Sequence, residues 1–234
     1  MEIALFTSNS MRAVLDELLP QYERATGNTV RVSYDPGKIM RQRIDAGETA
    51  DVGILGRAML DELAEQGKIV PESRRALARC GVGVGVLAGK PRPDVSTLDA
   101  FKRALLDAKS IAFTVSGASG IHFSSVIEKL GIAEAIRAKA VRQPGGLVGE
   151  LLVAGGAELA IQQIPELMAV PGVEVVGPLP REVQATSTSG VGVFTSSRNK
   201  AAAQALADLL ATPESAKVFR AKGHEPENGT DPFS

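Results

Sequence analysis

The stretch CGVGVGVLA, residues Cys80–Ala88, places glycine at alternate positions of an apolar run that reads as a strand. Glycine inside a strand gives up side-chain packing, so it usually marks a bend or the close approach of another backbone. A second stretch of this kind, SGVGVFT at Ser189–Thr195, resembles the first more than any other part of the chain does. The roughly one hundred residues between them are enough for a complete α/β unit.

Strands and helices alternate on the N-terminal side of the first glycine-rich stretch. Apolar residues recur at helical spacing from Met11 to Ala25, where Pro20 predicts a kink or a break. The expected strands are Ile3–Phe6, Thr29–Tyr34 and Asp51–Leu55, and the expected helices are Met11–Ala25, Lys38–Ala46 and Met59–Gln66. This alternation predicts a mostly parallel sheet with helices on its faces.

A second α/β series lies between the two glycine-rich stretches. The expected helices are Phe101–Ala108, Ile121–Leu130, Glu134–Ala138 and Leu147–Val153, and the expected strands are Ser110–Val115, Glu158–Gln162 and Glu174–Val176. Helices Lys200–Leu210 and Glu214–Ala221 follow, and then a polar tail, Glu225–Ser234. His224 and this tail are expected to be solvated. Two helices are too little to fold alone, so this segment is expected to pack on the first series.

These patterns predict an α/β protein of two lobes joined by two crossover hinge strands. Lobe 1 comprises residues 1–82 and 192–234, and lobe 2 comprises residues 83–191. The alternative is one doubly wound sheet that contains two glycine-rich strands.

Composition excludes several classes of protein. The formal charge is −1, aromatic residues make up 4% of the chain and Trp is absent, so neither nucleic acid nor an anionic membrane surface is an expected partner. The single Cys80 cannot form an intramolecular disulfide and is expected to be packed, and the two histidines are far apart, so no metal or cofactor is expected. No run reaches the length of a membrane span and no leader precedes the first strand. The protein is therefore expected in the periplasm if a leader was removed before Met1, and otherwise in the cytoplasm.

Two loops that join a strand to a helix carry small polar residues. In the first, Thr7–Ser10, one side chain is enough to cap the helix, and Ser8, Asn9 and Ser10 together favour an anion held at the helix N-terminus. The second loop is SGASG, and its residues Ser116, Gly117, Ala118, Ser119 and Gly120 combine hydroxyl donors with glycines that let a ligand approach the backbone. Each loop is a weak signal alone, and the pair predicts a bipartite anion site.

Four other positions are candidates with an ordinary structural alternative. Lys38 and Arg57 follow βα turns and either neutralise a carboxylate or lie on the surface. His122 in the first turn after SGASG is either exposed or a proton carrier. One of Gln162 and Gln163 either orients a ligand or merely ends a strand.

With these pieces in place, the sequence resembles type II periplasmic solute-binding proteins, in the molybdate-binding-protein-like branch. The resemblance is carried by FTSNSMRAVLDELLPQYERATGNTVRVSY (Phe6–Tyr34), RQRIDAGETADVGIL (Arg41–Leu55), SIAFTVSGASGIHFSSVIEKLGI (Ser110–Ile132), GELLVAGGAELAI (Gly149–Ile161) and AAQALADLLATPESAKVFRAKGHEP (Ala202–Pro226). No single piece is specific, but their order and spacing together are. The resemblance implies two lobes that close on a small ligand in the cleft between them.

The resemblance also implies which residues bind the ligand. The family's binding segments fall on Ser8, Asn9 and Ser10, on Pro36, Gly37 and Lys38, on Ser116 to Gly120, on Gly145 and Gly146, and on Gln162 and Gln163. The last segment of the molybdate binders has a tyrosine where this chain has glutamine, and their proline-bracketed turn is replaced by VSGASG, which argues against molybdate. The segment PGVEVVGPLPREVQ (Pro171–Gln184) looks like a sister group whose ligands are small organic acids, a group similar in part to aconitate isomerase.

The sequence thus leads to two hypotheses of different classes. The first is a solute-binding component of an ABC-type transporter, which binds a di- or tricarboxylate by hinge closure and has a membrane permease as its partner. The second is an isomerase of a small polycarboxylate on the same scaffold, in which His122 or Lys38 carries the proton. A third and weaker possibility is a cytoplasmic ligand sensor.

Overall fold

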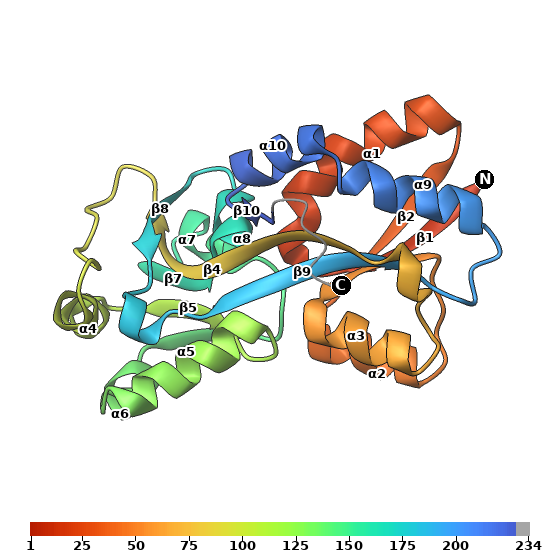
Figure 1. The fold of residues 1–234 in the computed structure, drawn as a ribbon. Coiled ribbons are helices and arrows are strands. Elements are labelled where there is room, and N and C mark those ends of the chain that lie inside the picture. Colours follow the sequence, from red (N-terminus) through yellow and green to blue (C-terminus); the bar gives the residue numbers. More distant parts are fainter. Residues whose placement is uncertain (228–234) are drawn as a thin grey trace. The chain divides into compact units, whose positions relative to one another are not determined.

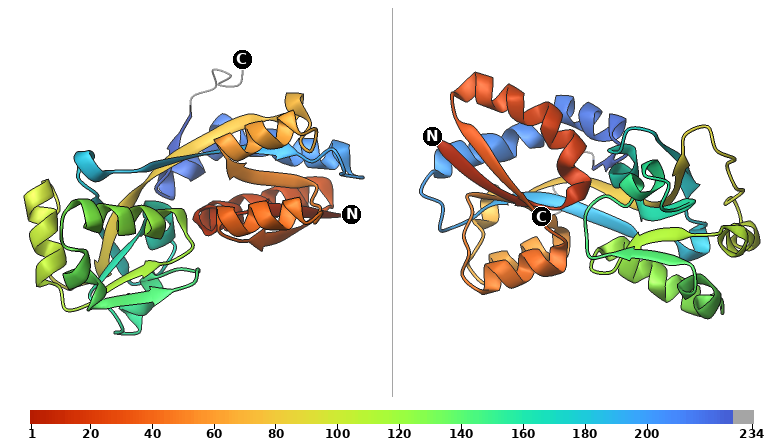
Figure 2. Two further views of the ribbon diagram at one scale, coloured as in Figure 1. Left: turned by 90° about the horizontal axis from the view of Figure 1, so that it is seen from below. Right: turned by 180° about the vertical axis from the view of Figure 1, so that it is seen from behind.

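The computed structural model describes residues 1–227 and divides the chain into two compact units. Unit 1 contains Met1–Arg79 and the segment from Ser187 onward, and unit 2 contains Cys80–Thr186. Both ends of the colour scale therefore occur in unit 1, whereas the green and cyan middle of the chain forms unit 2 (Figure 2). Unit 1 is discontinuous in sequence and unit 2 is continuous.

The sheet of unit 1 is mostly parallel, as the alternating pattern predicts. Its strands are β1 (Glu2–Thr7), β2 (Thr29–Tyr34), β3 (Val52–Gly56) and β9 (Thr186–Val193), in the order β2-β1-β3-β9. β1 pairs in parallel with β2 and β3, and β9 pairs antiparallel with β3. The short strand β10 (Glu225–Pro226) pairs antiparallel with the beginning of β4 (Arg75–Leu87). The carboxyl ends of β1, β2 and β3 thus lead into the first three helices at one edge of the sheet.

Helices cover both faces of this sheet (Figure 1). On one face lie α1 (Arg12–Thr26), α9 (Lys200–Leu210) and α10 (Pro213–Ala221), and on the other lie α2 (Gly37–Asp45) and α3 (Arg57–Glu65). Alternation along β1 sorts its side chains, because Ile3 and Leu5 pack in the cluster of α1 and α9 whereas Phe6 packs in the cluster of α2 and α3. This doubly covered sheet accounts for the near-continuous apolar run of β1.

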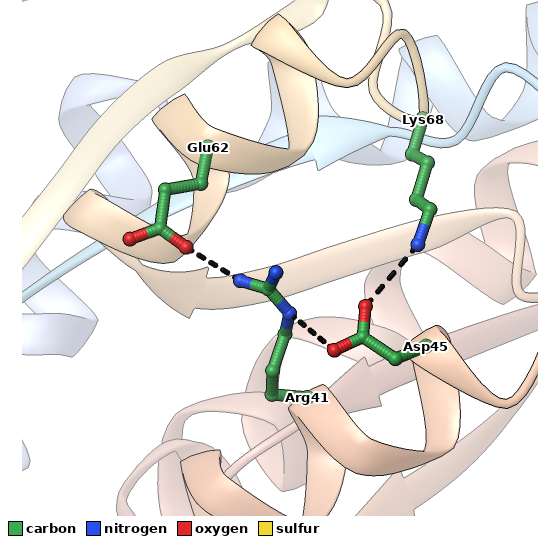
Figure 3. A network of polar contacts seen from close by, with 4 residues as sticks. All are labelled: Arg41, Asp45, Glu62 and Lys68. Carbon is green, nitrogen blue, oxygen red and sulfur yellow. Dashed lines mark hydrogen bonds and ion pairs between the residues drawn. The ribbon is translucent and has the colours of Figure 1, made fainter.

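Four charged side chains connect α2 to α3 and to Lys68, which lies just beyond α3 (Figure 3). Arg41 donates Nε to Asp45 Oδ2 at 2.8 Å and Nη1 to Glu62 Oε2 at 2.5 Å. Lys68 Nζ lies 3.2 Å from the other oxygen of Asp45. Arg41 and Lys68 lower the pKa of the Asp45 carboxyl. The partners of the half-buried Arg41 are exposed, so these ion pairs contribute little to the stability of the fold.

Unit 2 is built on a mixed sheet of the order β4-β7-β5-β6, with β8 also paired to β4. Its strands are β5 (Ile111–Thr114), β6 (Ala140–Gln143), β7 (Leu159–Gln163) and β8 (Val173–Pro178). β5 pairs in parallel with β6 and β7, whereas β4 pairs antiparallel with β7 and β8. One face is covered by α4 (Leu98–Asp107), α5 (Ala118–Lys129) and α6 (Ala133–Arg137), and the other by α7 (Gly149–Val153) and α8 (Ile164–Met168).

The glycine alternation in β4 has a packing cause. Its valines Val82, Val84 and Val86 point into the main core of unit 2. On the opposite face, a Cβ added to Gly83 would lie 2.7 Å from Ile164 Cγ1, and one added to Gly85 would lie 3.0 Å from Leu167 Cδ2. The glycines therefore let α8 pack directly on the strand, which is the close approach that the sequence indicates.

The structure has the α/β class and most of the elements that the sequence predicts. Gly27, Gly47, Gly67 and Gly131 all follow helices and have φ between +65° and +90°, the left-handed conformation that is typical of glycine at helix ends. The break at Pro20 is wrong, because α1 continues through it to Thr26. The strands β6 and β10 and the helix α8 were not expected from the sequence. Of the predicted polar tail, residues 228–234 lie outside the described residues.

Candidate functional site

The first predicted loop begins where β1 ends. Thr7 is the last residue of the strand, Ser8 is extended, and the 3-10 helix η1 (Asn9–Met11) leads into α1. The hydroxyls of Ser8 and Ser10 are 2.9 Å apart, and neither start of a helix here receives a side-chain cap. A single polar side chain would be enough to cap the helix, but none of these residues does so. The hydroxyls bond to each other instead. The N–H groups of Met11 and Arg12 already donate to the backbone oxygens of Ser8 and Asn9, so an anion at this loop would be bound by the N–H groups at the start of η1.

Arg12, which the sequence did not single out, lies beside this loop. Its Nη2 donates to Asn9 Oδ1 at 3.1 Å, and its guanidinium carbon lies 4.0 Å from the centre of the Tyr34 ring. Burial raises the pKa of the Tyr34 hydroxyl, the charge of Asp16 raises it further, and the charge of Arg12 opposes both. The signal in the sequence was position alone, since Arg12 is the first cation after the polar loop.

His224, far along the chain, contacts this loop. His224 is 2% exposed, and its Nε2 lies 3.0 Å from the backbone oxygen of Ser10. Because a carbonyl only accepts, Nε2 carries the proton, and the buried Nδ1 has no partner in the described residues. The ring also packs edge-on against Phe219 at a centroid distance of 5.5 Å. The expected solvated end is thus wrong at His224, which is a core residue of unit 1.

The other predicted residues of unit 1 lie at the starts of α2 and α3. Gly37 begins α2 after Pro36, which provides no side-chain cap. Lys38 is exposed with no ion pair in the described part of the chain. Arg57 opens α3 and its Nη1 lies 3.9 Å from Glu227 Oε2. The guanidinium of Arg57 therefore already faces a carboxylate of the chain itself.

The second predicted loop lies at the start of α5 in unit 2. Gly117 occupies the position before the helix, with no side-chain cap, and Ser116 Oγ donates to the backbone oxygen of Pro144. A Cβ added to Gly120 would lie 1.7 Å from the backbone oxygen of Thr114, so only glycine fits there. Ser119 is buried, and the Thr114 hydroxyl is buried without a partner in the described residues. The glycines therefore allow the loop to pack closely against the end of β5.

Gln162 joins two further predicted segments of unit 2. Its side chain is 1% exposed, its Nε2 donates to the Gly146 oxygen at 2.7 Å, and its Oε1 accepts from Val148 N at 2.9 Å. Gly146 has φ +88° and follows Gly145 at the tip of this loop. The segments at 116–120, 145–146 and 162 are thus brought together, with Gln162 holding the loop. Gln163 lies next to them as the half-buried residue before α8.

A family model described as a bacterial extracellular solute-binding protein matches residues 3–225. The chain belongs to this family. The match spans both units, which confirms the resemblance seen in the sequence.

Two curated relatives of this solute-binding protein are similar over almost its whole length. Aconitate isomerase from a Pseudomonas species is 31% identical over 96% of this chain and 87% of its own. The molybdate-binding protein ModA from Azotobacter vinelandii is 27% identical over 95% of this chain and 89% of its own. One relative is thus named as an enzyme and the other as a binding protein.

Solved structures confirm the fold of this solute-binding protein. The periplasmic molybdate-binding protein of Azotobacter vinelandii has a TM-score of 0.75 at 18% identity, covering 95% of this chain and 98% of its own. The sulfate-binding protein SubI of Mycobacterium tuberculosis has a TM-score of 0.74 at 17% identity, covering 98% of this chain and 88% of its own. At this identity the likeness shows the periplasmic-binding-protein fold and not the ligand.

His122, the predicted proton carrier, lies on α5 and is half-buried. One ring nitrogen, Nε2, lies 2.7 Å from the backbone oxygen of Val183. A carbonyl only accepts, so the neutral ring carries its proton on Nε2 and leaves Nδ1 as the basic nitrogen. The solute-binding protein thus has a histidine of fixed orientation in the first turn after SGASG.

Other features of the solute-binding protein add little to the candidate site. Burial raises the pKa of Cys80 to about 12, so this thiol remains protonated and packed. Within residues 1–227 no three His, Cys, Asp or Glu side chains gather as a metal site, and no helix is long and apolar enough to cross a membrane. Two cavities of 670 and 590 Å³ border the segment around Arg92, and none of the predicted site residues lines them.

Proposed function

We propose that this solute-binding protein binds a small organic anion with two or three carboxylates, and that it serves an ABC-type transporter as its solute-binding component. The observation that carries the proposal is the match between the two loops. In each unit, a strand ends in a threonine whose buried hydroxyl has no partner among residues 1–227. A helix start without a side-chain cap follows, after Ser8 in one unit and at Gly117 in the other. Uncapped N–H groups and adjacent hydroxyls suit an anionic oxygen.

The choice of a carboxylate rests on two further observations. A relative that is 31% identical is named for aconitate, which is a tricarboxylate. The segment of Gln162 and Gln163 has glutamine where the molybdate binders of the resemblance have a tyrosine, and the amide of Gln162 is engaged with the backbone of its own unit. These observations favour di- and tricarboxylates over molybdate, and the transport role further requires a location outside the cytoplasmic membrane and a permease partner.

Calorimetric titration of the purified protein tests the proposed ligand class. The panel contains cis-aconitate, trans-aconitate, citrate, tricarballylate and succinate, with molybdate and sulfate as tetrahedral oxyanions. We expect saturable binding of at least one carboxylate in preference to both oxyanions. Absence of binding by every carboxylate contradicts the proposal, and so does preference for molybdate or sulfate.

Paired variants test whether the first loop binds the anion. The double variant Ser8→Ala with Ser10→Ala removes both hydroxyls, and we expect the affinity to fall roughly 10-fold or more, as for lost hydrogen bonds to a charged group. Ser196→Ala, an exposed serine of the same unit, is the control and should bind as the wild type does. Equal affinity of the double variant and the control would exclude the loop from the site.

An isomerase is the second candidate, because the 31% identical relative is itself named as an isomerase. In such a reaction a base removes a proton from a methylene carbon beside a carboxylate, and a proton is returned at the far carbon of the allylic anion, so the double bond moves without net change of atoms. Nδ1 of His122 is the available base on α5, and the exposed Lys38 can act only after losing its proton.

Proton exchange separates the enzyme from the pure binding protein. Aconitate is incubated with the protein in D₂O and deuterium incorporation is followed by NMR. An isomerase exchanges faster than buffer and loses this in His122→Gln, which can still donate to Val183 through its amide but has no basic nitrogen. Lys38→Gln tests the other base in the same way. Exchange at the buffer rate by the wild type, together with aconitate binding, leaves the binding protein as the function.

A further inference from the structure

Arg12 differs from the other arginines of the described chain in its surroundings. The arginines that are half-buried and have a carboxylate within 4.0 Å are Arg41, Arg43, Arg57, Arg74 and Arg75. Apart from Arg12, the described arginines without such a carboxylate are all exposed: Arg24, Arg103, Arg142, Arg181, Arg198 and Arg220. Within residues 1–227, Arg12 alone is half-buried and has no carboxylate. A partly desolvated cation without a counter-charge carries an electrostatic cost that a ligand carboxylate would remove.

The guanidinium of Arg12 is nevertheless held in place. Asn9 Oδ1 accepts from Nη2 at 3.1 Å, and the Tyr34 ring lies under the group at 4.0 Å, within the range of a cation–π contact. This hydrogen bond uses one of the five N–H donors of the fork. An edge of the fork therefore remains for the two oxygens of a carboxylate, without a large entropic cost of ordering the side chain.

The helix also leaves the charge uncompensated. Arg12 is the first residue of α1, where the partial positive charge of the helix N-terminus opposes a cation. Asp16, one turn later, is exposed and makes no ion pair with it in the described structure. An anion bound at the loop would meet the positive potential of both the helix start and Arg12.

From these contacts we infer that Arg12 binds a carboxylate of the ligand through its free edge and is the cation that selects carboxylates at this site. This inference rests on the proposed function and deepens it. It assigns the charge to Arg12 in place of the two cations that the sequence favoured. Arg57 faces Glu227, and Lys38 is exposed, so neither is both fixed and uncompensated.

Three variants of the full-length protein test the assignment by titration with tricarballylate and cis-aconitate. Arg12→Gln removes the charge, and we expect affinity to fall roughly 10- to 100-fold, as for a lost charge-assisted contact. Arg12→Lys keeps the charge but loses the planar fork, so its affinity should lie between those of Arg12→Gln and the wild type. Arg24→Gln removes the same charge from an exposed position of the same helix and should leave affinity unchanged. Circular dichroism of each ligand-free variant confirms that it is folded.

The results separate this inference from the proposed function. If the wild type binds none of the carboxylates, the proposed function fails. If the wild type binds them and folded Arg12→Gln binds equally well, the proposed function stands and the assignment of Arg12 is overturned. An equal loss in Arg12→Gln and Arg24→Gln also overturns it, because the effect is then one of net charge. Affinity of Arg12→Lys equal to that of the wild type overturns the role of the fork.

Discussion

Thr7 and Thr114 each carry a buried hydroxyl that has no partner in the described structure, and each ends the strand that leads into a candidate loop. A buried hydroxyl without a hydrogen bond costs about 1–3 kcal/mol. Valine has nearly the same shape and no such cost. The threonine at each position is therefore a stability cost located at the two loops.

Replacing Thr114 by valine is expected to stabilise the ligand-free protein. Removal of the unpaired hydroxyl should raise the free energy of unfolding by about 1 kcal/mol. Urea unfolding followed by circular dichroism measures the change. Thr114→Ser, which keeps the hydroxyl and loses the methyl group, is the matched control and should be destabilised. A loss of stability in Thr114→Val would mean that the hydroxyl is bonded.

His224 makes stability depend on pH. Burial lowers the pKa of His224, and the hydrogen bond to Ser10 only partly opposes this. The unfolded chain therefore takes up a proton near pH 6.5, about the ordinary value for histidine, before the folded chain does. Stability is complete above that pH and falls below it, by up to about 1.4 kcal/mol per pH unit, until the lowered folded pKa is reached.

The variant His224→Gln tests this dependence. Glutamine can still donate to the Ser10 oxygen but does not titrate. Urea unfolding of both proteins between pH 8 and pH 5 gives the difference in free energy of unfolding at each pH. We expect this difference to shift in favour of the variant as pH falls through 6.5. A difference that is constant with pH would show that His224 does not titrate on unfolding.

At the scale of the elements, glycines decide how closely helices approach strands. Gly120 in α5 has the least room, since an added Cβ would lie 1.7 Å from the Thr114 backbone oxygen. Gly120→Ala should therefore destabilise the protein by about 3 kcal/mol, because backbone and not a flexible side chain blocks the methyl group. Gly56 before α3 has nothing within 4 Å of an added Cβ and a negative φ.

Gly56→Ala is accordingly the control for this experiment. It should leave the free energy of unfolding unchanged or raise it by about 0.4–1 kcal/mol. Chemical unfolding measured in parallel compares the two variants. Similar stabilities would show that α5 can move away from β5 without cost.

Local rules predicted the elements well where the pattern itself supplies the physics. Helical periodicity ended by a glycine located α2 and α3 to within a residue or two of the expected bounds. At Pro20 the helix does not break, because the packed residues Val14, Leu15, Leu18 and Tyr22 hold α1 together across the missing hydrogen bond. The short helix α8 was missed because it is a single turn that follows directly on β7.

The site was harder to predict, because its contacts join residues that are far apart in the sequence. The polar loops were visible as composition, and their position after strands is confirmed. The contact of His224 with Ser10 spans 214 positions, and no local pattern indicates it. Arg12 fits an ordinary amphipathic helix in the sequence. Only the folded chain shows that Tyr34 and Asn9 hold it and that no carboxylate of the described residues pairs with it.

For the whole molecule, binding of the anion should be visible as thermal stabilisation. A ligand at 100 times its Kd adds about 2.7 kcal/mol to the free energy of unfolding. A chain of this size shifts its Tm by about 2–4 °C per kcal/mol. We therefore expect a shift of about 5–10 °C with a bound tricarboxylate in differential scanning fluorimetry, and the shift should shrink in Arg12→Gln. A shift of the same size in that variant would contradict the role of Arg12.

The discontinuity of unit 1 also sets the order in which the protein can fold during synthesis. Unit 2 is one continuous segment and is complete on the ribosome before β9, α9 and α10 of unit 1 have been made. Until then one face of the β1–β3 sheet has α1 but not the C-terminal helices, so Ile3 and Val52 lack part of their packing partners. The nascent chain therefore carries an unfinished apolar surface at its N-terminal end while its middle is already folded. A chaperone that acts on this protein should therefore bind residues 1–79, the part made first. It should release them only when the segment from Ser187 onward has been made and has packed on them.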